Sequence, residues 1–249
     1  MSKRKEQSSS VKQIIFSIFF IIAVAIGIIT GDINVGSLAS GSGDYNSSIT
    51  SYDLENIPEY SGEPYTIINE NKPNFNEEDF LTDSFESYSE LDELGRCGVA
   101  FANLGKETMP AEGETRKSIS NIKPTGWHNV KYDNINGKNL YNRCHLIAYC
   151  LSAENDNEKN LITGTRYFNV EGMLTFEKEV LEYLRANENN HVLYRVTPIF
   201  EGENLVASGV TIEIASVEDR GEELEFYVYV YNVQPGITID YATGNSSIN

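Results

Sequence analysis

Basic side chains are scarce in this sequence of 249 residues, which holds 19 lysines and arginines against 37 aspartates and glutamates and has a net charge of −18. That total excludes tight non-specific binding of a polyanion, because carboxylates repel phosphates. The acid is unevenly placed, however. Residues 31–95 carry −14 and residues 181–249 carry −8, whereas residues 96–180 carry +1. The central region therefore permits a modest, salt-sensitive contact with nucleic acid.

The sequence also has few cysteines and lacks the glycine-rich motifs that bind nucleotides. Cys97, Cys144 and Cys150 are odd in number, and their spacing matches no paired C-x2-C zinc pattern. We expect them to be small, mostly buried side chains, and the sequence leaves open whether two of them form a disulfide, and which two. Neither G-x-G-x-x-G nor G-x4-G-K-[ST] occurs, so no nucleotide cofactor is indicated.

A single long apolar run is present, from Ile14 to Ile29, and a basic stretch with Lys3, Arg4 and Lys5 precedes it. Its length lies between that of a signal-peptide core and that of a comfortable membrane span. We favour an uncleaved signal anchor over residues 1–30, with cleavage after Ala39 as the alternative. The basic flank predicts a cytoplasmic N-terminus. The rest is then extracellular, either secreted or anchored to the outer face of the cytoplasmic membrane.

Residues 31–93 are expected to form an acidic, low-complexity linker. Residues 31–95 have 15 acidic side chains against one basic side chain, Lys72, and no sustained apolar periodicity. Such a composition buries too little apolar surface to offset the entropy of ordering, which predicts a disordered stalk. The folded domain is expected over residues 94–249.

Within that domain, apolar patterns predict strands first, then a strand and helix, then strands again. The central helix is expected at about 167–186, with Val170, Met173, Leu174, Val180, Leu181 and Leu184 on one face. Strands are expected at 97–104, 127–132, 161–163, 192–200, 205–217, 226–233 and 237–242, with a strand leading into a short helix within 140–151. A turn is expected at Asn136-Gly137. This order favours an α+β fold over repeated βαβ units.

His145 is a candidate catalytic residue. It is one of 3 histidines and follows Arg143 at i+2, so the two side chains share a face of an extended chain. A neighbouring guanidinium keeps an imidazole neutral, as a general base requires, and it can also hold a phosphate. The other interpretation is a histidine that merely packs beside the apolar residues Leu146 and Ile147.

Glu177 falls on the apolar face of the expected helix. A buried carboxylate is costly unless it is paired, hydrogen-bonded or near a metal ion. Two interpretations stay open: a metal-associated carboxylate, or a salt bridge to Arg143, Arg166 or Arg195.

Asn160 and Asn169 bracket the segment LITGTRYF. Asn160 would close a loop before a strand, and Asn169 would lie in the first turn of the long helix. Both positions are ordinary for capping asparagines. The amide oxygen is also a hard, neutral ligand that suits Mg²⁺.

Taken together, these residues resemble a known family. NRCH at 142–145 is similar to the D-R-G-H signature of the bacterial DNA/RNA non-specific endonucleases, the ββα-metal (His-Me finger) nucleases. The similarity is closer to the DNA-entry nuclease and streptodornase-like branch. It extends from about Leu94 to Gly244, through LGRCGVA, YNRCHLIAY, NEKNLITGTRYFNVEGM, HVLYRVTP and YNVQPGITIDYATG. The ordered set, with asparagines in N-x8-N followed by a glutamate, is what makes the resemblance specific.

The resemblance implies a ββα-metal core on a mainly antiparallel sheet and a metal-dependent, sequence-non-specific endonuclease that leaves 5′-phosphate ends. It implies DNA as substrate, RNA as well, and Mg²⁺ as cofactor with Mn²⁺ as a substitute. By the same resemblance, His145 is the general base, Asn169 holds the metal and Asn160 shapes the site. Glu177 then meets the waters of the metal, and Arg143 faces the phosphate.

Two departures from the signature stand beside the histidine. Asn142 replaces its aspartate and Cys144 replaces its glycine. Neither position is the base or the metal ligand, so activity should survive, although Cys144 places a side chain where the signature has none. The alternatives are a membrane-anchored DNA receptor without hydrolysis and a phosphoesterase for small substrates.

Overall fold

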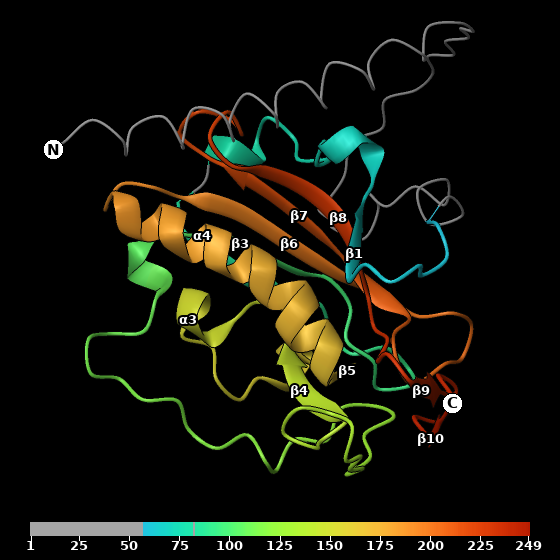
Figure 1. Cartoon of the computed structure of the whole chain (residues 1–249). Coiled ribbons are helices and arrows are strands. Elements are labelled where there is room, and N and C mark those ends of the chain that lie inside the picture. The colour runs from blue at the N-terminus through green and yellow to red at the C-terminus, as the bar shows by residue number, and fades with distance from the viewer. Residues whose placement is uncertain (1–56, 82) are drawn as a thin grey trace, which may run out of the picture. The chain divides into compact units, whose positions relative to one another are not determined.

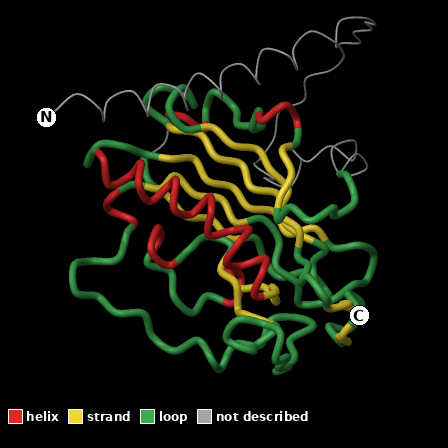
Figure 2. Tube along the Cα trace, viewed as in Figure 1, coloured by secondary structure: helices red, strands yellow, loops and turns green. Residues whose placement is uncertain are grey.

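The computed structural model describes residues 57–81 and 83–249. The expected signal anchor and the linker residues up to 56 lie outside this range. A six-stranded sheet in the order β1-β8-β7-β6-β3-β2 forms the centre of the domain, and every neighbouring pair is antiparallel (Figures 1 and 2). Its strands are β1 (Tyr65–Ile67), β2 (Phe85–Tyr88), β3 (Ala100–Leu104), β6 (Val192–Ile199), β7 (Gly209–Ser216) and β8 (Glu225–Tyr231).

A separate hairpin and helix pack on one face of this sheet. β4 (Tyr141–His145) pairs antiparallel with β5 (Leu161–Thr165), and the short helix α3 (Tyr149–Ser152) lies between them in sequence. The helix α4 (Leu174–Ala186) follows β5 through a π-helical turn, Phe168–Met173, and runs across the sheet (Figure 1). The chain ends in a two-stranded sheet of β9 (Ile237–Ile239) and β10 (Ser246–Ile248). The expected α+β fold with a ββα unit on a mainly antiparallel sheet is confirmed.

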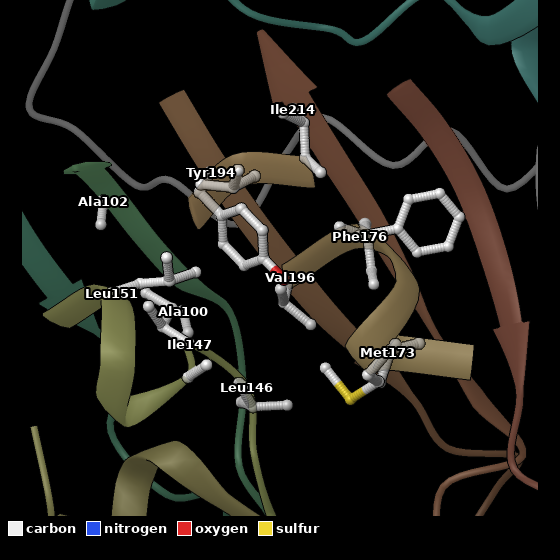
Figure 3. Packing of buried hydrophobic residues seen from close by; sticks show 14 of the residues in the cluster. Ala100, Ala102, Leu146, Ile147, Leu151, Met173, Phe176, Tyr194, Val196 and Ile214 are labelled. Carbon is white, nitrogen blue, oxygen red and sulfur yellow. The ribbon is translucent and has the colours of Figure 1, made fainter. Parts of the chain in front are cut away.

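Alternation along the strands explains why both faces of the sheet are buried. On β8, Val228 and Val230 face the helices, whereas Tyr227, Tyr229 and Tyr231 face the opposite side. β3 and β6 follow the same two-residue period. Between the sheet and the helices lies the main apolar core, shown in part in Figure 3 with Leu146, Ile147, Met173, Phe176 and Tyr194 among its side chains.

The opposite face of the sheet is covered by the chain before β3. Phe75, Phe80 and Phe85 pack against Val99, Phe101 and Leu193. The buried ion pair between Arg195 and Glu213 (Nε to Oε2, 2.6 Å) is closed over by the backbone of Asn74, whose N–H donates to Glu213 and whose carbonyl accepts from Arg195. The buried charges are therefore both paired and hydrogen-bonded, as burial requires.

These contacts correct the expected domain boundary. Residues 57–93 are not a linker, because β1 and β2 supply both edge strands of the main sheet and the segment between them covers its outer face. The acidic composition hid this role, because the few apolar residues are spread among polar ones and find partners far away in sequence. The folded part of the chain therefore begins well before residue 94.

One expected strand is also corrected. Residues 127–132 form no strand, only an isolated bridge between Lys131 and Asn139. The turn that closes this bridge does include Asn136-Gly137, and Gly137 has φ 79°, in the left-handed region that glycine favours. In the described ranges, 57–81 and 83–249, no helix has the length and apolar character that a membrane span requires.

Candidate active site

His145 ends β4 and lies at one side of a cleft of about 1130 Å³. Its side chain is buried, and both ring nitrogens have partners. Nε2 is 2.9 Å from the backbone carbonyl oxygen of Asn155, and Nδ1 is 3.1 Å from a guanidinium nitrogen of Arg116. A carbonyl only accepts and a guanidinium only donates. The proton therefore resides on Nε2, and Nδ1 presents its lone pair.

This environment keeps the imidazole neutral. Burial lowers the pKa of His145 to about 4, because an apolar surrounding disfavours the charged ring. The positive charge of Arg116 lowers the pKa further, whereas the backbone carbonyl of Asn155 opposes the change. A neutral, oriented imidazole whose Nδ1 carries a lone pair and no proton is the form that a general base requires.

The turn after His145 is held by Asn160, which is fully buried. Its side-chain oxygen accepts from the backbone N–H of Ile147 (2.8 Å), and its side-chain nitrogen donates to the carbonyl of the same residue (3.0 Å). The backbone N–H of Leu146 also donates to the carbonyl of Asn160 (2.9 Å). Asn160 thus fixes the backbone directly beyond His145 instead of reaching into the cleft.

The β4–β5 hairpin is joined to the main sheet by Asn232, a fully buried residue that follows β8. Its side-chain oxygen accepts from Thr165 (2.9 Å), and its nitrogen donates to the carbonyls of Thr163 (3.1 Å) and Ala207 (2.9 Å). Sequence reasoning missed this residue, because its partners are remote in sequence and an isolated polar residue at the end of a strand carries no distinctive pattern.

Cys144 does not distort the strand that carries His145. Its side chain is fully buried and occupies the space beside Gly164 on β5, where an added Cβ would lie 2.5 Å from the Cys144 sulfur. Because Gly164 on β5 has no side chain, it leaves room for the side chain of Cys144 on β4. Burial raises the pKa of this thiol above its usual range. All three cysteines are free thiols in the structure.

Asn169 enters the cleft from the π-helical turn that precedes α4. The backbone N–H of Leu174 donates to the carbonyl of Asn169, the i→i−5 bond of a π-helix. Gly172 permits the wider turn to approach β8, because a Cβ at that position would lie 2.4 Å from a methyl carbon of Val230. π-Helical turns of this kind are frequent at functional sites.

Glu177 lies in the first turn of α4 and lines the same cleft. Burial raises its pKa to about 7, and the charge of Arg116 partly offsets this increase. In the part of the chain that the structure describes, neither the Glu177 carboxylate nor the Asn169 amide forms a side-chain hydrogen bond or an ion pair. The salt bridge that was one interpretation of Glu177 is therefore not formed with Arg143, Arg166 or Arg195. Two oxygen-bearing side chains without protein partners face one cleft, a donor set that fits a hard divalent cation.

Arg143 lines the cleft, and its guanidinium binds the connection before β4 and no atom of His145. Its Nε donates to the carbonyl of Ile122, and a terminal nitrogen donates to the carbonyl of Ser120 (3.0 Å). The guanidinium also stacks on Trp127, 4.0 Å from the ring centroid. Arg143 therefore holds the long connection between β3 and β4, and the guanidinium beside His145 belongs to Arg116.

Arg116 was not identified from the sequence. It stands in a polar, exposed connection without periodicity, so no pattern singles it out. A charge count does offer a signal, since residues 116–143 hold six basic side chains against the single acid Asp133. Several of these basic groups line the cleft, together with Arg166 from the end of β5: Arg116, Lys123 and Arg143.

This chain is similar in sequence and fold to several nucleases. A curated deoxyribonuclease of Streptococcus dysgalactiae subsp. equisimilis is 27% identical over 196 residues, which cover 63% of this chain and 59% of that protein. The chain thus spans about three-fifths of the relative's length. The structure of NucA from Streptococcus agalactiae without metal has a TM-score of 0.67 at 29% identity, covering 80% of this chain and 93% of NucA.

NucA with a magnesium ion bound matches equally well, with a TM-score of 0.67 at 28% identity and the same coverage. The Sda1 nuclease with a bound zinc ion has a TM-score of 0.57 at 27% identity, covering 66% of this chain and 82% of Sda1. Residues 75–218 match the family described as DNA/RNA non-specific endonuclease, so the resemblance seen in the sequence is confirmed. This chain belongs to the DNA/RNA non-specific endonuclease family.

Proposed function

We propose that the protein is a metal-dependent endonuclease that hydrolyses phosphodiester bonds of DNA, and of RNA as well, with little sequence preference. The observation that carries this proposal is the state of His145. Its imidazole is neutral, its Nε2 proton is held by the carbonyl of Asn155, and its Nδ1 is an acceptor beside the cleft. The unpartnered side chains of Asn169 and Glu177 line the same cleft.

His145 acts as the general base. Its Nδ1 takes a proton from a water molecule as the water oxygen bonds to phosphorus, and the bond from phosphorus to the 3′ oxygen breaks. The products are a 5′-phosphate and a 3′-hydroxyl, whose proton comes from solvent, and the imidazolium returns its proton to solvent. The carbonyl of Asn155 holds the ring in orientation throughout, because it continues to accept from Nε2.

Asn169 would hold a divalent cation, with Glu177 contacting its bound waters. Mg²⁺ suits these oxygen donors, with Mn²⁺ as a substitute, and NucA has been solved with magnesium. When bound, the cation supplies charge stabilisation for the scissile phosphate and the leaving oxygen. A single direct protein ligand holds a metal weakly, so the orientation provided by Glu177 matters for affinity.

Substrate binding is assigned to the basic connection between β3 and β4. In a chain with net charge −18, residues 116–143 have an excess of five positive charges, and part of this segment lines the cleft. Lys123 and Arg166 are suited to phosphate contacts. Contacts limited to phosphate and sugar carry no sequence information, which accounts for low sequence preference. The basic flank and apolar run before residue 30 support a location of this domain outside the cell.

Plasmid DNA with Mg²⁺, with and without EDTA, tests the proposal. Nicked or fragmented plasmid that requires the metal is the expected result. Retarded but intact plasmid would instead support a DNA receptor, the alternative that retains the basic cleft and lacks hydrolysis. Intact and unretarded plasmid would point to a phosphoesterase for small substrates.

A further inference from the structure

The general base is blocked in the structure. Nδ1 of His145 has one lone pair, and a terminal nitrogen of Arg116 donates to it at 3.1 Å. The opposite nitrogen carries the proton given to Asn155. A water molecule cannot transfer a proton to Nδ1 while the guanidinium occupies this lone pair. Catalysis by His145 therefore requires that Arg116 leave the ring.

The segment that carries Arg116 is built to let it move. Residues 111–118 are exposed, with no buried side chain among them. On one side the connection is anchored at Thr108, whose hydroxyl donates to the carbonyl of Leu151 (2.7 Å). On the other side it is anchored by Arg143, through the carbonyls of Ser120 and Ile122. Arg116 lies between the two anchors, so its exposed side chain can change partner while the connection stays anchored at both ends.

A phosphate is the partner that would displace this contact. A guanidinium binds an anionic oxygen in a charge-assisted and often bidentate hydrogen bond, which is roughly twice as strong as a bond to a neutral acceptor. The imidazole of His145 is such a neutral acceptor, because burial keeps its pKa low. Arg116 itself lines the cleft in which the scissile phosphate would lie.

We propose that Arg116 is a removable cap on the general base: it occupies Nδ1 of His145 in the free protein, and a substrate phosphate draws it away. This inference rests on the proposed function. Arg116 is thus a positioning residue that couples the arrival of substrate to exposure of the base. No bond is made or broken in the exchange, and the guanidinium keeps its charge and its protons.

The exchange can be observed without hydrolysis. The full chain labelled with ¹⁵N has 3 histidines, so the imidazole nitrogens of His145 can be assigned by comparison with a His145→Gln variant. A short DNA duplex is added in the presence of EDTA. The Nδ1 resonance should move downfield, toward an unprotonated nitrogen without a hydrogen bond, while Nε2 keeps its proton. An Nδ1 resonance that stays in place although amide signals report saturation with duplex would overturn the cap.

Two variants separate this effect from a general loss of charge. In Arg116→Gln the Nδ1 resonance should already lie downfield without DNA, and duplex should move it no further. Arg185→Gln removes the same charge from an exposed position in the last turn of α4, outside the basic connection and the cleft, and should behave as the unmodified chain does. Unchanged signals of His128 and His191 verify folding in each variant. A free-state Nδ1 resonance that is unaltered in Arg116→Gln would also contradict the proposal.

Failure of the cap and failure of the proposed function give different results. If plasmid is cut but the Nδ1 resonance does not respond to duplex, His145 is not gated by Arg116 and the nuclease proposal stands. If no duplex binds and plasmid remains intact, the proposed function is wrong, and gating by a substrate phosphate is wrong with it.

Discussion

Replacement of Asn160 by alanine should destabilise the domain and slow the reaction together. The substitution leaves the N–H and the carbonyl of Ile147 without partners, and Ile147 is fully buried. Each unsatisfied buried group costs about 1–3 kcal/mol, so the loss is roughly 2–6 kcal/mol. For a domain of this size, 1 kcal/mol corresponds to about 2–4 °C in the melting temperature. The variant should therefore melt roughly 4–24 °C earlier.

The effect on the rate has a separate cause. Ile147 lies two positions after His145, so release of its backbone loosens the turn that sets the position of the imidazole. A misplacement of about 1 Å can cost roughly a hundredfold in rate. We expect a loss of about ten- to a hundredfold in plasmid nicking, measured below the melting temperature of the variant.

Asn157→Ala is the matched control for this experiment. Asn157 lies in the same turn, and its side-chain oxygen accepts from the backbone N–H of Lys159 (3.0 Å), but the site is only half-buried. Loss of such a cap costs about 1 kcal/mol. Melting temperatures from circular dichroism and plasmid nicking rates of both variants test the role of Asn160. If Asn160→Ala melts with Asn157→Ala and nicks at the unmodified rate, the assigned role of Asn160 is wrong.

Three further predictions follow from the site and the fold. Asn169→Ala should lower the rate of plasmid nicking and raise the Mg²⁺ concentration that gives half the maximal rate. Asn169→Asp should have a smaller effect because it keeps an oxygen ligand. An unchanged half-saturating concentration in both variants would mean that the metal binds elsewhere. A chain that begins at residue 89 loses the partly buried Phe75, Phe80 and Phe85, each worth less than the roughly 3 kcal/mol of a fully buried side chain, together with both edge strands. It should therefore melt far below a chain that begins at residue 57, and equal melting temperatures would mean that residues 57–88 are a linker after all. The pKa of His145 is lowered from 6.5 to about 4, so the unfolded state binds the proton first as pH falls. Unfolding free energy should therefore drop by about 3 kcal/mol between pH 6.5 and pH 4 relative to His145→Gln, and parallel pH curves would contradict the burial of a neutral ring.

The periodicity of apolar residues predicted most of the helices and strands, because each pattern lies within a single segment of the sequence. The Tyr-Val alternation over 226–233 predicts a strand whose valines and tyrosines face opposite sides of a sheet, and β8 has this arrangement. The helix of 167–186 was expected from its apolar face, although its first turn is π-helical, a detail that periodicity cannot report. The sequence motif also selected His145, Asn169 and Glu177, and the structure has all three lining one cleft.

The failures involve partners that are remote in sequence. β1 has three residues, and its pairing with β8 joins positions such as Tyr65 and Val230, so no local pattern marks it as a strand. Arg116 reaches His145 across 29 positions from an exposed connection. In both cases the tertiary partner, and not the intrinsic preference of the segment, determines the structure.

The measurement that tests the account most directly is the nicking rate of plasmid by His145→Ala with saturating Mg²⁺. His191→Ala is the control, because His191 lies outside the cleft, between Glu107 and Glu218. Loss of a general base should lower the rate by at least about a hundredfold. The control should retain its rate, and the melting temperatures of both variants should show an intact fold. A His145→Ala protein that nicks plasmid at nearly the unmodified rate would remove His145 from the mechanism and contradict the account.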